Sequence, residues 1–184
     1  MSRLVVVAGP SAVGKGTLVG ALRAKHSDVW VSVSATTRQP RQGEQEGVHY
    51  FFVTDDEFSR MIEAGELLEW AVVHGSHRYG TPRKPVEERL AMDMSVVLEI
   101  DLQGARQVKQ TMPEALFVFV APPTFEILIE RLAIRGTEDD EERQRRLRTA
   151  REELAAVAEF DVTVVNDRLD VAVAELEAIV ASAR

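Results

Sequence analysis

The chain has 184 residues, of which 45% are hydrophobic and 28% are charged, and this composition is ordinary for one globular domain. Its formal net charge of −8 argues against non-specific binding to nucleic acid or to an anionic membrane surface, because both require a basic face. Cysteine is absent, which excludes disulfide bonds and thiolate metal sites, and no apolar run approaches the roughly 20 residues that span a bilayer. We therefore expect a single cytoplasmic domain over residues 1–184, without nucleic-acid or membrane partners.

A phosphate-binding loop follows the first predicted strand, Leu4–Ala8. Gly9, four further residues, Gly14 and Lys15 match the G-x-x-x-x-G-K pattern, and a helix is predicted over Lys15–Lys25. In this context the helix N-terminus and the lysine ammonium attract phosphate oxygens. The alternative is a tight turn with a surface lysine, which the order of strand, loop and helix disfavours. The predicted phosphate-binding residues are Gly9, Pro10, Ser11, Ala12, Val13, Gly14, Lys15, Gly16 and Thr17.

The residue after the lysine departs from the usual phosphate loop. Ser or Thr normally stands there and offers a hydroxyl to Mg²⁺, whereas this chain has Gly16 followed by Thr17. Mg²⁺ would then be held mainly by phosphate oxygens and water, and a contribution of the Thr17 hydroxyl is left open. The order Gly-Lys-Gly-Thr is also common among nucleoside monophosphate kinases, which favours phosphoryl transfer between nucleotides over a switch GTPase or a motor.

Short apolar, β-branched runs alternate with helical patterns and predict an α/β fold with a parallel five-stranded sheet flanked by helices. The runs after the first are Val29–Val33, Val96–Ile100, Leu116–Val120 and Val162–Val165. Thr54 and Glu57 form a capping box that predicts a helix through about Ala64. Further helices are predicted over Thr124–Arg135, which ends at Gly136, over Asp139–Ala158 and over Asp170–Ala183.

Residues 34–83 interrupt this alternation and predict an inserted lobe. Turn residues in "RQPRQGEQEG" are followed by "HYFFV" and "LLEWAVV", which is typical of a partly antiparallel sheet. We expect a core over residues 1–33, 84–124 and 152–184, this lobe, and a helical lid over residues 125–151. The lobe should move relative to the core, and Gly136 and Thr137 suit a hinge for the lid, whose tip carries "TEDDEE".

Eight short strings, in order and at characteristic spacing, carry more specific information. They are "SVSATTRQPRQGE", "HYFFV", "LLEWAVVHG", "YGTP", "LEIDLQG", "RLAIRGTE", "RRLRTARE" and "VVND". In these strings the chain resembles the guanylate kinase family over nearly its whole length, from Leu4 to about Asp170. The resemblance implies an ATP:GMP phosphotransferase that also accepts dGMP, forms ADP and GDP, and uses Mg²⁺ with ATP as co-substrate.

The resemblance implies that Ser34, Glu69, Thr81 and Asp101 face the guanine base. Guanine presents N–H donors at N1 and N2 that carboxylates accept, whereas adenine presents at N1 a lone pair that a carboxylate repels. Glu69 would therefore select guanine by attraction and reject adenine by repulsion. Taken alone, Glu69 would be interpreted as a rim carboxylate in a strand beside Trp70.

The same resemblance implies that Arg38, Arg41, Tyr50 and Tyr79 hold the phosphate of GMP. Two guanidinium groups and two phenol donors suit a dianionic phosphate. Without the family pattern, the two arginines would more often be solvated surface charges, and Tyr50 would be ordinary strand packing.

Three further arginines match family positions that clamp the triphosphate and the transferred phosphoryl group. They are Arg131, Arg135 and Arg146, and the first two are four residues apart, so they share a helix face. Phosphoryl transfer needs little covalent help from a protein, so these cations and Lys15, with exclusion of water, would supply most of the catalysis.

The adenine and magnesium positions are less specific. Asn166 and Asp167 match a segment near the adenine in the family, although turn formation explains them equally well. Direct ligation of Mg²⁺ by Thr17, Glu99 or Asp101 is left open beside ligation through phosphates and water.

Departures from the family pattern are modest. Ala12 replaces a frequent glycine, and we expect it to adopt backbone angles accessible to an L-residue. Glu99 stands where aspartate is common, and Arg78 stands where tyrosine is frequent.

Two other functions compete with the leading hypothesis of a GMP kinase acting as a monomer or a homo-oligomer. A non-catalytic guanylate-kinase-like binding module is disfavoured because the phosphate loop is complete and Arg135 and Arg146 are present. A kinase for another monophosphate is disfavoured by the carboxylates of Glu69 and Asp101.

Overall fold

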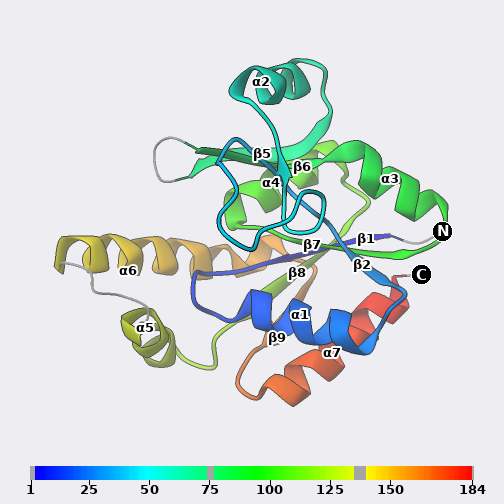
Figure 1. Ribbon diagram of the computed structural model, residues 1–184. Helices are drawn as coiled ribbons and strands as arrows, with labels where there is room; N and C mark the ends of the chain where they lie inside the picture. Colours follow the sequence, from blue (N-terminus) through cyan, green and yellow to red (C-terminus); the bar gives the residue numbers. More distant parts are fainter. Residues whose placement is uncertain (1–2, 74–76, 135–139, 184) are drawn as a thin grey trace.

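A parallel sheet of five strands forms the centre of the described part of the molecule in the computed structural model (Figure 1). The structure describes residues 3–73, 77–134 and 140–183, with no side chain described for residue 134 or residues 140–146. The sheet order is β2-β7-β1-β8-β9. The strands span Val29–Val31 (β2), Ser95–Glu99 (β7), Leu4–Ala8 (β1), Leu116–Ala121 (β8) and Val162–Val165 (β9).

The central strand β1 is apolar along its whole length because helices cover both faces of the sheet. Leu4 pairs with Val96 of β7, and Val5 pairs with Leu116 of β8, both in parallel register. Successive side chains of β1 therefore point to opposite faces, and each of its residues is at most 1% exposed.

Two hydrophobic clusters pack on these faces. Val5 and Val7 join a cluster that includes Leu18 and Leu176, while Leu4 and Val6 join the other cluster. Figure 1 shows α1 and α7 on one side of the sheet and α3 and α4 on the other. The helices are α1 (Lys15–Lys25), α3 (Arg83–Ala91), α4 (Leu102–Thr111), α5 (Phe125–Ile134), α6 (Asp140–Ala155) and α7 (Leu169–Ser182). A short 3₁₀ helix, Ala156–Glu159, follows α6.

The inserted segment forms a second sheet of mixed direction, as the sequence predicts. Its order is β4-β3-β6-β5, in which β3 pairs with β4 in parallel and with β6 antiparallel, and β5 pairs with β6 antiparallel. The strands span Ala35–Thr36 (β3), Phe51–Phe52 (β4), Leu67–Val73 (β5) and His77–Pro82 (β6). The capping box of Thr54 and Glu57 is present and begins α2, Asp55–Glu63, whose Phe58 is fully buried.

The α/β class and the five parallel strands are therefore confirmed, with small differences at element ends. The strand predicted over Val29–Val33 ends at Val31, and the helix predicted to run to Ala158 is α-helical only to Ala155. The sequence pattern does not single out α3 or α4, because each is short and has few apolar residues. The predicted cap at Gly136 and hinge at Thr137 lie outside the described residues. No helix in the described ranges is long and apolar enough to cross a bilayer.

Candidate active site

The phosphate loop connects the carboxyl end of β1 to the first turn of α1. Gly14 is the N-cap of α1 and has a φ of 98°, in the left-handed region that favours glycine. The Lys15 ammonium donates to the carbonyl oxygens of Gly9 (2.6 Å) and Pro10 (3.2 Å), so it closes back over the loop. A Cβ at Gly9 would lie 2.3 Å from the carbonyl oxygen of Val120, which requires glycine for steric reasons.

This loop encloses a polar cavity of about 260 Å³. The helix N-terminus and the Lys15 side chain both direct positive potential into it, which makes the cavity suitable for phosphate. The lining residues include most of the predicted phosphate loop and are Pro10, Ser11, Ala12, Gly14, Lys15, Gly16, Thr17 and Glu99.

The backbone conformation of Ala12 is uncommon for an alanine. Ala12 has a φ of 62°, in the left-handed region, where an alanine is strained by the proximity of its Cβ to a carbonyl oxygen. An L-residue can adopt this angle, but at a cost that glycine avoids. The replacement of glycine at this position therefore affects the backbone energy of the loop.

Two carboxylates border the phosphate loop. A Cβ on Gly16 would lie 3.4 Å from Glu99 Oε1, in ordinary van der Waals contact, so this carboxylate lies directly beside Gly16. The Glu99 side chain is exposed, yet the surrounding protein still desolvates it in part and raises its pKa, and the nearby Lys15 ammonium offsets part of that rise. Ser11 donates its backbone N–H to Glu153 Oε2 at 3.4 Å. Glu153 is only 9% exposed, and this burial raises its pKa. The charge of Lys15 lowers the pKa, but its effect is smaller than that of burial.

Glu153 was not among the residues that the sequence analysis singles out. It belongs to the charged stretch that becomes α6, where an acidic residue normally indicates a solvated helix face. Only the tertiary structure brings this carboxylate to the phosphate loop.

Arg131 and Asn166 also contact the phosphate loop, at the backbone of Val13. The Arg131 guanidinium donates to the carbonyl oxygens of Val13 (3.3 Å) and Asn166 (3.1 Å). The buried Asn166 amide also donates to the carbonyl oxygen of Val13, at 2.9 Å. A Cβ on Gly14 would lie 2.5 Å from Asn166 Nδ2, so this contact also requires glycine.

Of the other members of the predicted clamp and adenine segment, only the Asp167 side chain belongs to the described part of the chain. Asp167 is exposed beside Asn166. Arg135 lies outside the described residues, and Arg146 belongs to α6 with its side chain outside the described part.

The carboxylates predicted to face guanine lie together beside helix α4. Thr81 on β6 donates its hydroxyl to Glu69 Oε1 on β5, at 2.6 Å. Asp101 is the N-cap of α4 and accepts the N–H of Gly104 at 2.7 Å. A Cβ on Gly104 would lie 3.0 Å from Glu69 Oε2 and 3.3 Å from Asp101 Oδ1, so the two carboxylates meet over this glycine.

Glu69 is 7% exposed, and its surroundings oppose ionisation. Burial raises its pKa to about 7, the negative charge of Asp101 adds to the rise, and hydrogen bonds from Thr81 offset part of it. The ionised form of such a buried carboxylate is stabilised by any further hydrogen-bond donor that approaches it.

Three of the four residues predicted to hold the acceptor phosphate lie side by side. Arg38 Nε donates to the Tyr79 hydroxyl at 3.1 Å, and the Arg38 guanidinium lies 5.4 Å from the centre of the Tyr50 ring. The two tyrosine rings meet edge to face at 5.7 Å. Arg41 is exposed, and its backbone N–H donates to Glu44.

The sequence analysis assigns no role to Glu44, which organises this group. It accepts two hydrogen bonds from Arg38 Nη2, at 2.8 and 3.1 Å, and one from the backbone of Arg41, at 2.7 Å. The Arg38 guanidinium holds the pKa of Glu44 below its ordinary value. Ser34 is the remaining residue predicted to contact guanine, and it is partly exposed. Its backbone carbonyl oxygen accepts the N–H of Phe51, and no hydrogen bond of its hydroxyl occurs among the described residues.

A family model for guanylate kinase matches residues 1–183 of the chain. The chain belongs to the guanylate kinase family. It is 58% identical over 183 residues to a guanylate kinase of Bifidobacterium longum (strain NCC 2705), and the match covers 97% of this chain and 93% of the relative. It is 57% identical over 177 residues to a guanylate kinase of Streptomyces coelicolor (strain ATCC BAA-471 / A3(2) / M145), covering 96% and 89% of the two chains.

Solved structures agree with membership of the guanylate kinase family. The crystal structure of guanylate kinase from Anaplasma phagocytophilum matches with a TM-score of 0.74 at 31% identity, over 98% of this chain and 85% of that one. A shikimate kinase from Bacteroides thetaiotaomicron matches with a TM-score of 0.52 at 17% identity, over 98% and 99% of the chains, and shows likeness of fold alone.

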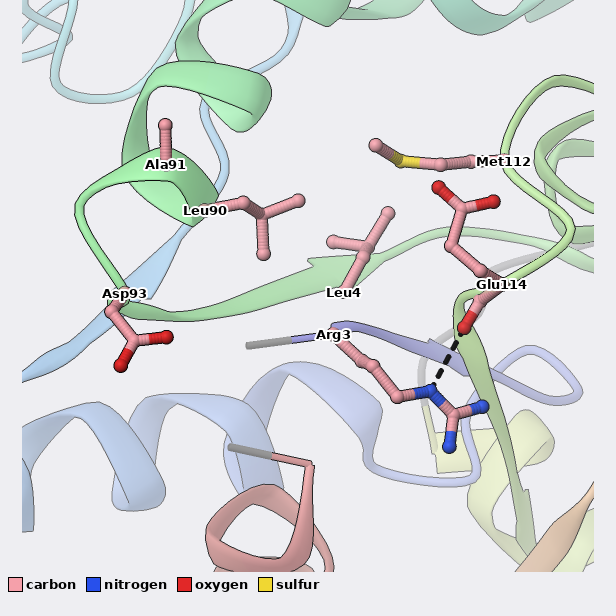
Figure 2. A pocket seen from close by; sticks show the side chains of 7 residues that line it. All are labelled: Arg3, Leu4, Leu90, Ala91, Asp93, Met112 and Glu114. Atoms are coloured by element: carbon pink, nitrogen blue, oxygen red, sulfur yellow. Dashed lines mark hydrogen bonds between the residues drawn. The ribbon is translucent and has the colours of Figure 1, made fainter. Parts of the chain in front are cut away.

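A larger cavity, of about 590 Å³, is lined by none of the residues predicted to bind nucleotide (Figure 2). Arg3, Leu4 and Asp93 stand at or before the amino ends of β1 and β7, whereas the phosphate loop follows the carboxyl end of β1. Ligands of open α/β sheets bind at the carboxyl ends of the strands, so this cavity is on the wrong side for the nucleotide. Figure 2 shows Arg3 donating to the carbonyl oxygen of Glu114 across one wall, at 2.9 Å.

Proposed function

We propose that this protein transfers the γ-phosphoryl group of ATP to GMP, giving ADP and GDP, at a site made by the phosphate loop and the Glu69–Asp101 pair. The family match and its relatives support GMP phosphorylation. The observation that carries the assignment of the site is the meeting of two carboxylates over Gly104 beside the Thr81 hydroxyl. We place the reaction in the cytoplasm, in purine nucleotide metabolism.

Guanine would enter between Glu69 and Asp101 with its N1–H and N2–H donors towards the carboxylates. The raised pKa of Glu69 reflects the cost of a buried charge without a cationic partner, and guanine would supply the missing donors. Adenine would leave the carboxylate facing a lone pair, so the pocket rejects it by repulsion and by an unpaired polar group. These contacts involve the base alone, so dGMP should also be accepted.

The phosphate of GMP would bind where Arg38, Tyr50 and Tyr79 converge. The Arg38 guanidinium now shares its N–H donors with Glu44 and Tyr79, so it is oriented before the phosphate arrives. Arg41 is exposed at the edge of this group and would approach the phosphate when the lobe closes.

The donor phosphates would bind in the loop cavity, held by backbone N–H groups and the Lys15 ammonium. The oxygen donors beside it fit Mg²⁺, because the Glu99 carboxylate and the exposed Thr17 hydroxyl both line the cavity. No group of three or more acidic, histidine or cysteine side chains that could hold a metal occurs among the described residues. Glu99 and Thr17, which line the loop cavity, and Asp101, two residues after Glu99, would hold Mg²⁺ directly or through water, and the ion would supply neutralisation of phosphate charge.

The residues of the chain would catalyse transfer by positioning and charge. The Lys15 ammonium would stabilise the negative charge that shifts from the γ-phosphoryl group to the leaving ADP. The Arg131 guanidinium would exchange its hydrogen bonds to carbonyl oxygens for hydrogen bonds to phosphate oxygens. Arg135 and Arg146 complete the proposed clamp. We propose that the lobe of residues 34–83 and the lid of residues 125–151 close over the core of residues 1–33, 84–124 and 152–184, which excludes water.

The experiment that tests this function is release of ADP from ATP and Mg²⁺ with GMP, AMP, dTMP or UMP at equal concentration. We expect turnover with GMP and little with the other three acceptors. Activity with AMP equal to that with GMP would overturn the guanine assignment. Silence with all four acceptors, from protein shown to be folded by circular dichroism, would favour the non-catalytic binding module instead.

A further inference from the structure

Helix α4 substitutes for a neighbouring strand along the outer edge of β5. β5 is the last strand in the order β4-β3-β6-β5, so its outer backbone groups have no strand partner within the described sheet. The Gln107 amide fills this role: Oε1 accepts the N–H of Trp70 at 3.0 Å, and Nε2 donates to the carbonyl oxygen of Trp70 at 2.8 Å. A primary amide that pairs with both groups of one residue reproduces the pattern of a β-ladder.

Thr111 makes a second contact of the same kind one helical turn later. Its hydroxyl lies 2.8 Å from the carbonyl oxygen of Leu68 and 3.2 Å from that of Gln107 in its own helix. Leu68 is 1% exposed, so this carbonyl has little access to water and depends on a protein donor. Leu68 and Trp70 flank Glu69, so α4 holds the backbone on both sides of the carboxylate.

The contact with α4 lies where the β5–β6 pairing is irregular. The register of the two strands shifts between Leu67 and Glu69, which is a bulge or a similar irregularity. A bulge bends its strand and disrupts the local ladder between the two strands. The bonds from Gln107 and Thr111 act from the other edge at the same place.

Both guanine carboxylates are therefore organised by one helix. Asp101 is the N-cap of α4, Gly104 provides the close approach to Glu69, and Gln107 and Thr111 follow along the side of α4 that meets β5. We propose that Gln107 and Thr111 are positioning residues for guanine selection, which hold the β5 backbone so that Glu69 faces Asp101. This inference rests on the proposed function, because it assumes that these carboxylates recognise the base.

The proposal can be tested by removing the hydrogen bonds from α4 side chains to the β5 backbone, because none of these side chains would touch the nucleotide. Gln107→Met keeps the length of the side chain and loses both bonds, and Thr111→Val keeps the branched shape and loses one. Gln110→Met is the matched control, because Gln110 is exposed on the same helix. We expect each test variant to raise KM for GMP about tenfold and to lower the preference for GMP over AMP by a similar factor. The control should leave both values unchanged.

Three readouts separate positioning from a general structural role. KM for ATP and the urea midpoint of unfolding should change much less than KM for GMP, and kcat at saturating GMP should be largely retained. In a Glu69→Gln background, Gln107→Met should have little further effect on base preference, because both changes act through the same carboxylate. Equal losses for ATP and GMP, or additive effects in the double variant, would overturn the proposal.

The outcomes also distinguish this inference from the proposed function. Absence of GMP turnover in the unaltered protein removes the proposed function and this inference with it. Normal turnover in the unaltered protein, with GMP selectivity unchanged in Gln107→Met and Thr111→Val, removes only the inference. If Gln107→Met does not fold, Thr111→Val carries the same comparison.

Discussion

The phosphate loop and the proposed guanine pocket, formed by Glu69, Thr81 and Asp101, are built in contrasting ways. The loop consists of consecutive residues whose backbone angles and N–H groups make an anion site, and its glycines are required by close contacts with Val120 and Asn166. The pocket consists of side chains from β5, β6 and the N-terminus of α4, which are separated in sequence by up to 32 residues between Glu69 and Asp101. A site for phosphate can therefore be local, whereas a site for a base needs groups from several elements.

The two regions also differ in charge. The helix N-terminus and Lys15 make the loop attractive to anions before any ligand binds. In the pocket, two carboxylates lie near each other, and burial with the charge of Asp101 raises the pKa of Glu69 to about 7. The loop therefore favours negative charge, whereas the surroundings of Glu69 oppose it.

Removal of the loop's cation should have the largest effect. Lys15→Met should lower kcat by about 10³-fold or more, because the charge that stabilises the moving phosphoryl group is lost, while GMP affinity stays largely intact. Steady-state kinetics and calorimetric titration with GMP measure the two quantities. Lys25→Met, at the far end of α1 and paired with Glu177, is the control. Loss of GMP binding in Lys15→Met would show that the two regions are not independent.

Neutralisation of the pocket should affect selectivity more than turnover. Glu69→Gln should lower the ratio of kcat/KM for GMP to that for AMP by about 100-fold, because the carboxylate that accepts from guanine and repels adenine is gone. KM for ATP should change little. Glu66→Gln removes an exposed carboxylate from the residues just before β5 and serves as the control. Unchanged discrimination against AMP would contradict the role of Glu69.

The same substitution should stabilise the protein at alkaline pH. The folded-state pKa of Glu69 is raised to about 7 from an ordinary 4.5, so its contribution to stability is complete below 4.5 and is lost as pH rises through 7. Glu69→Gln removes this loss and should increase the free energy of unfolding by about 1 to 3 kcal/mol at pH 8. Urea denaturation at pH 8 and pH 5 measures the effect, which should nearly vanish at pH 5. An equal gain at both values would rule out ionisation as its cause.

The smallest predicted effect concerns the strained residue of the loop. Ala12→Gly should relieve about 1 kcal/mol of strain in the left-handed backbone conformation. Part of this gain in stability should be offset, because glycine gives the unfolded chain more conformational entropy. The net gain in stability should be about 0.5 kcal/mol or less, measured as a urea midpoint. Ala24→Gly in helix α1 should instead cost about 0.5 to 1 kcal/mol. A loss of stability at both positions would mean that the angle of Ala12 carries no strain.

Elements with strong local signals were predicted well. The bounds of β1, α1 and β9 agree with the structure, because a continuous apolar run or a glycine loop followed by a helix depends on few distant contacts. The capping box of α2 is also confirmed. α3 and α4 were not singled out, since each is short and has few large apolar residues, and both derive their stability from packing against the sheet.

The candidate site divides along the same line. The comparisons confirm the family and the fold, while the roles of the individual residues stay predictions. Glu44 and Glu153 were missed because a carboxylate in a polar stretch carries no local mark of a distant partner. Gln107 was missed because its partner, Trp70, lies 37 residues earlier in the chain, and nothing in the local sequence marks that contact.

The sequence by itself determined the phosphate loop, the alternation of strands and helices, and the family of this protein, because each depends on residue types at fixed short spacing. The tertiary structure decided which carboxylates meet, since contact between β5 and α4 requires the inserted lobe to pack on the core. It also decided the raised pKa of Glu69, because burial and the charge of Asp101 act only after the chain has folded.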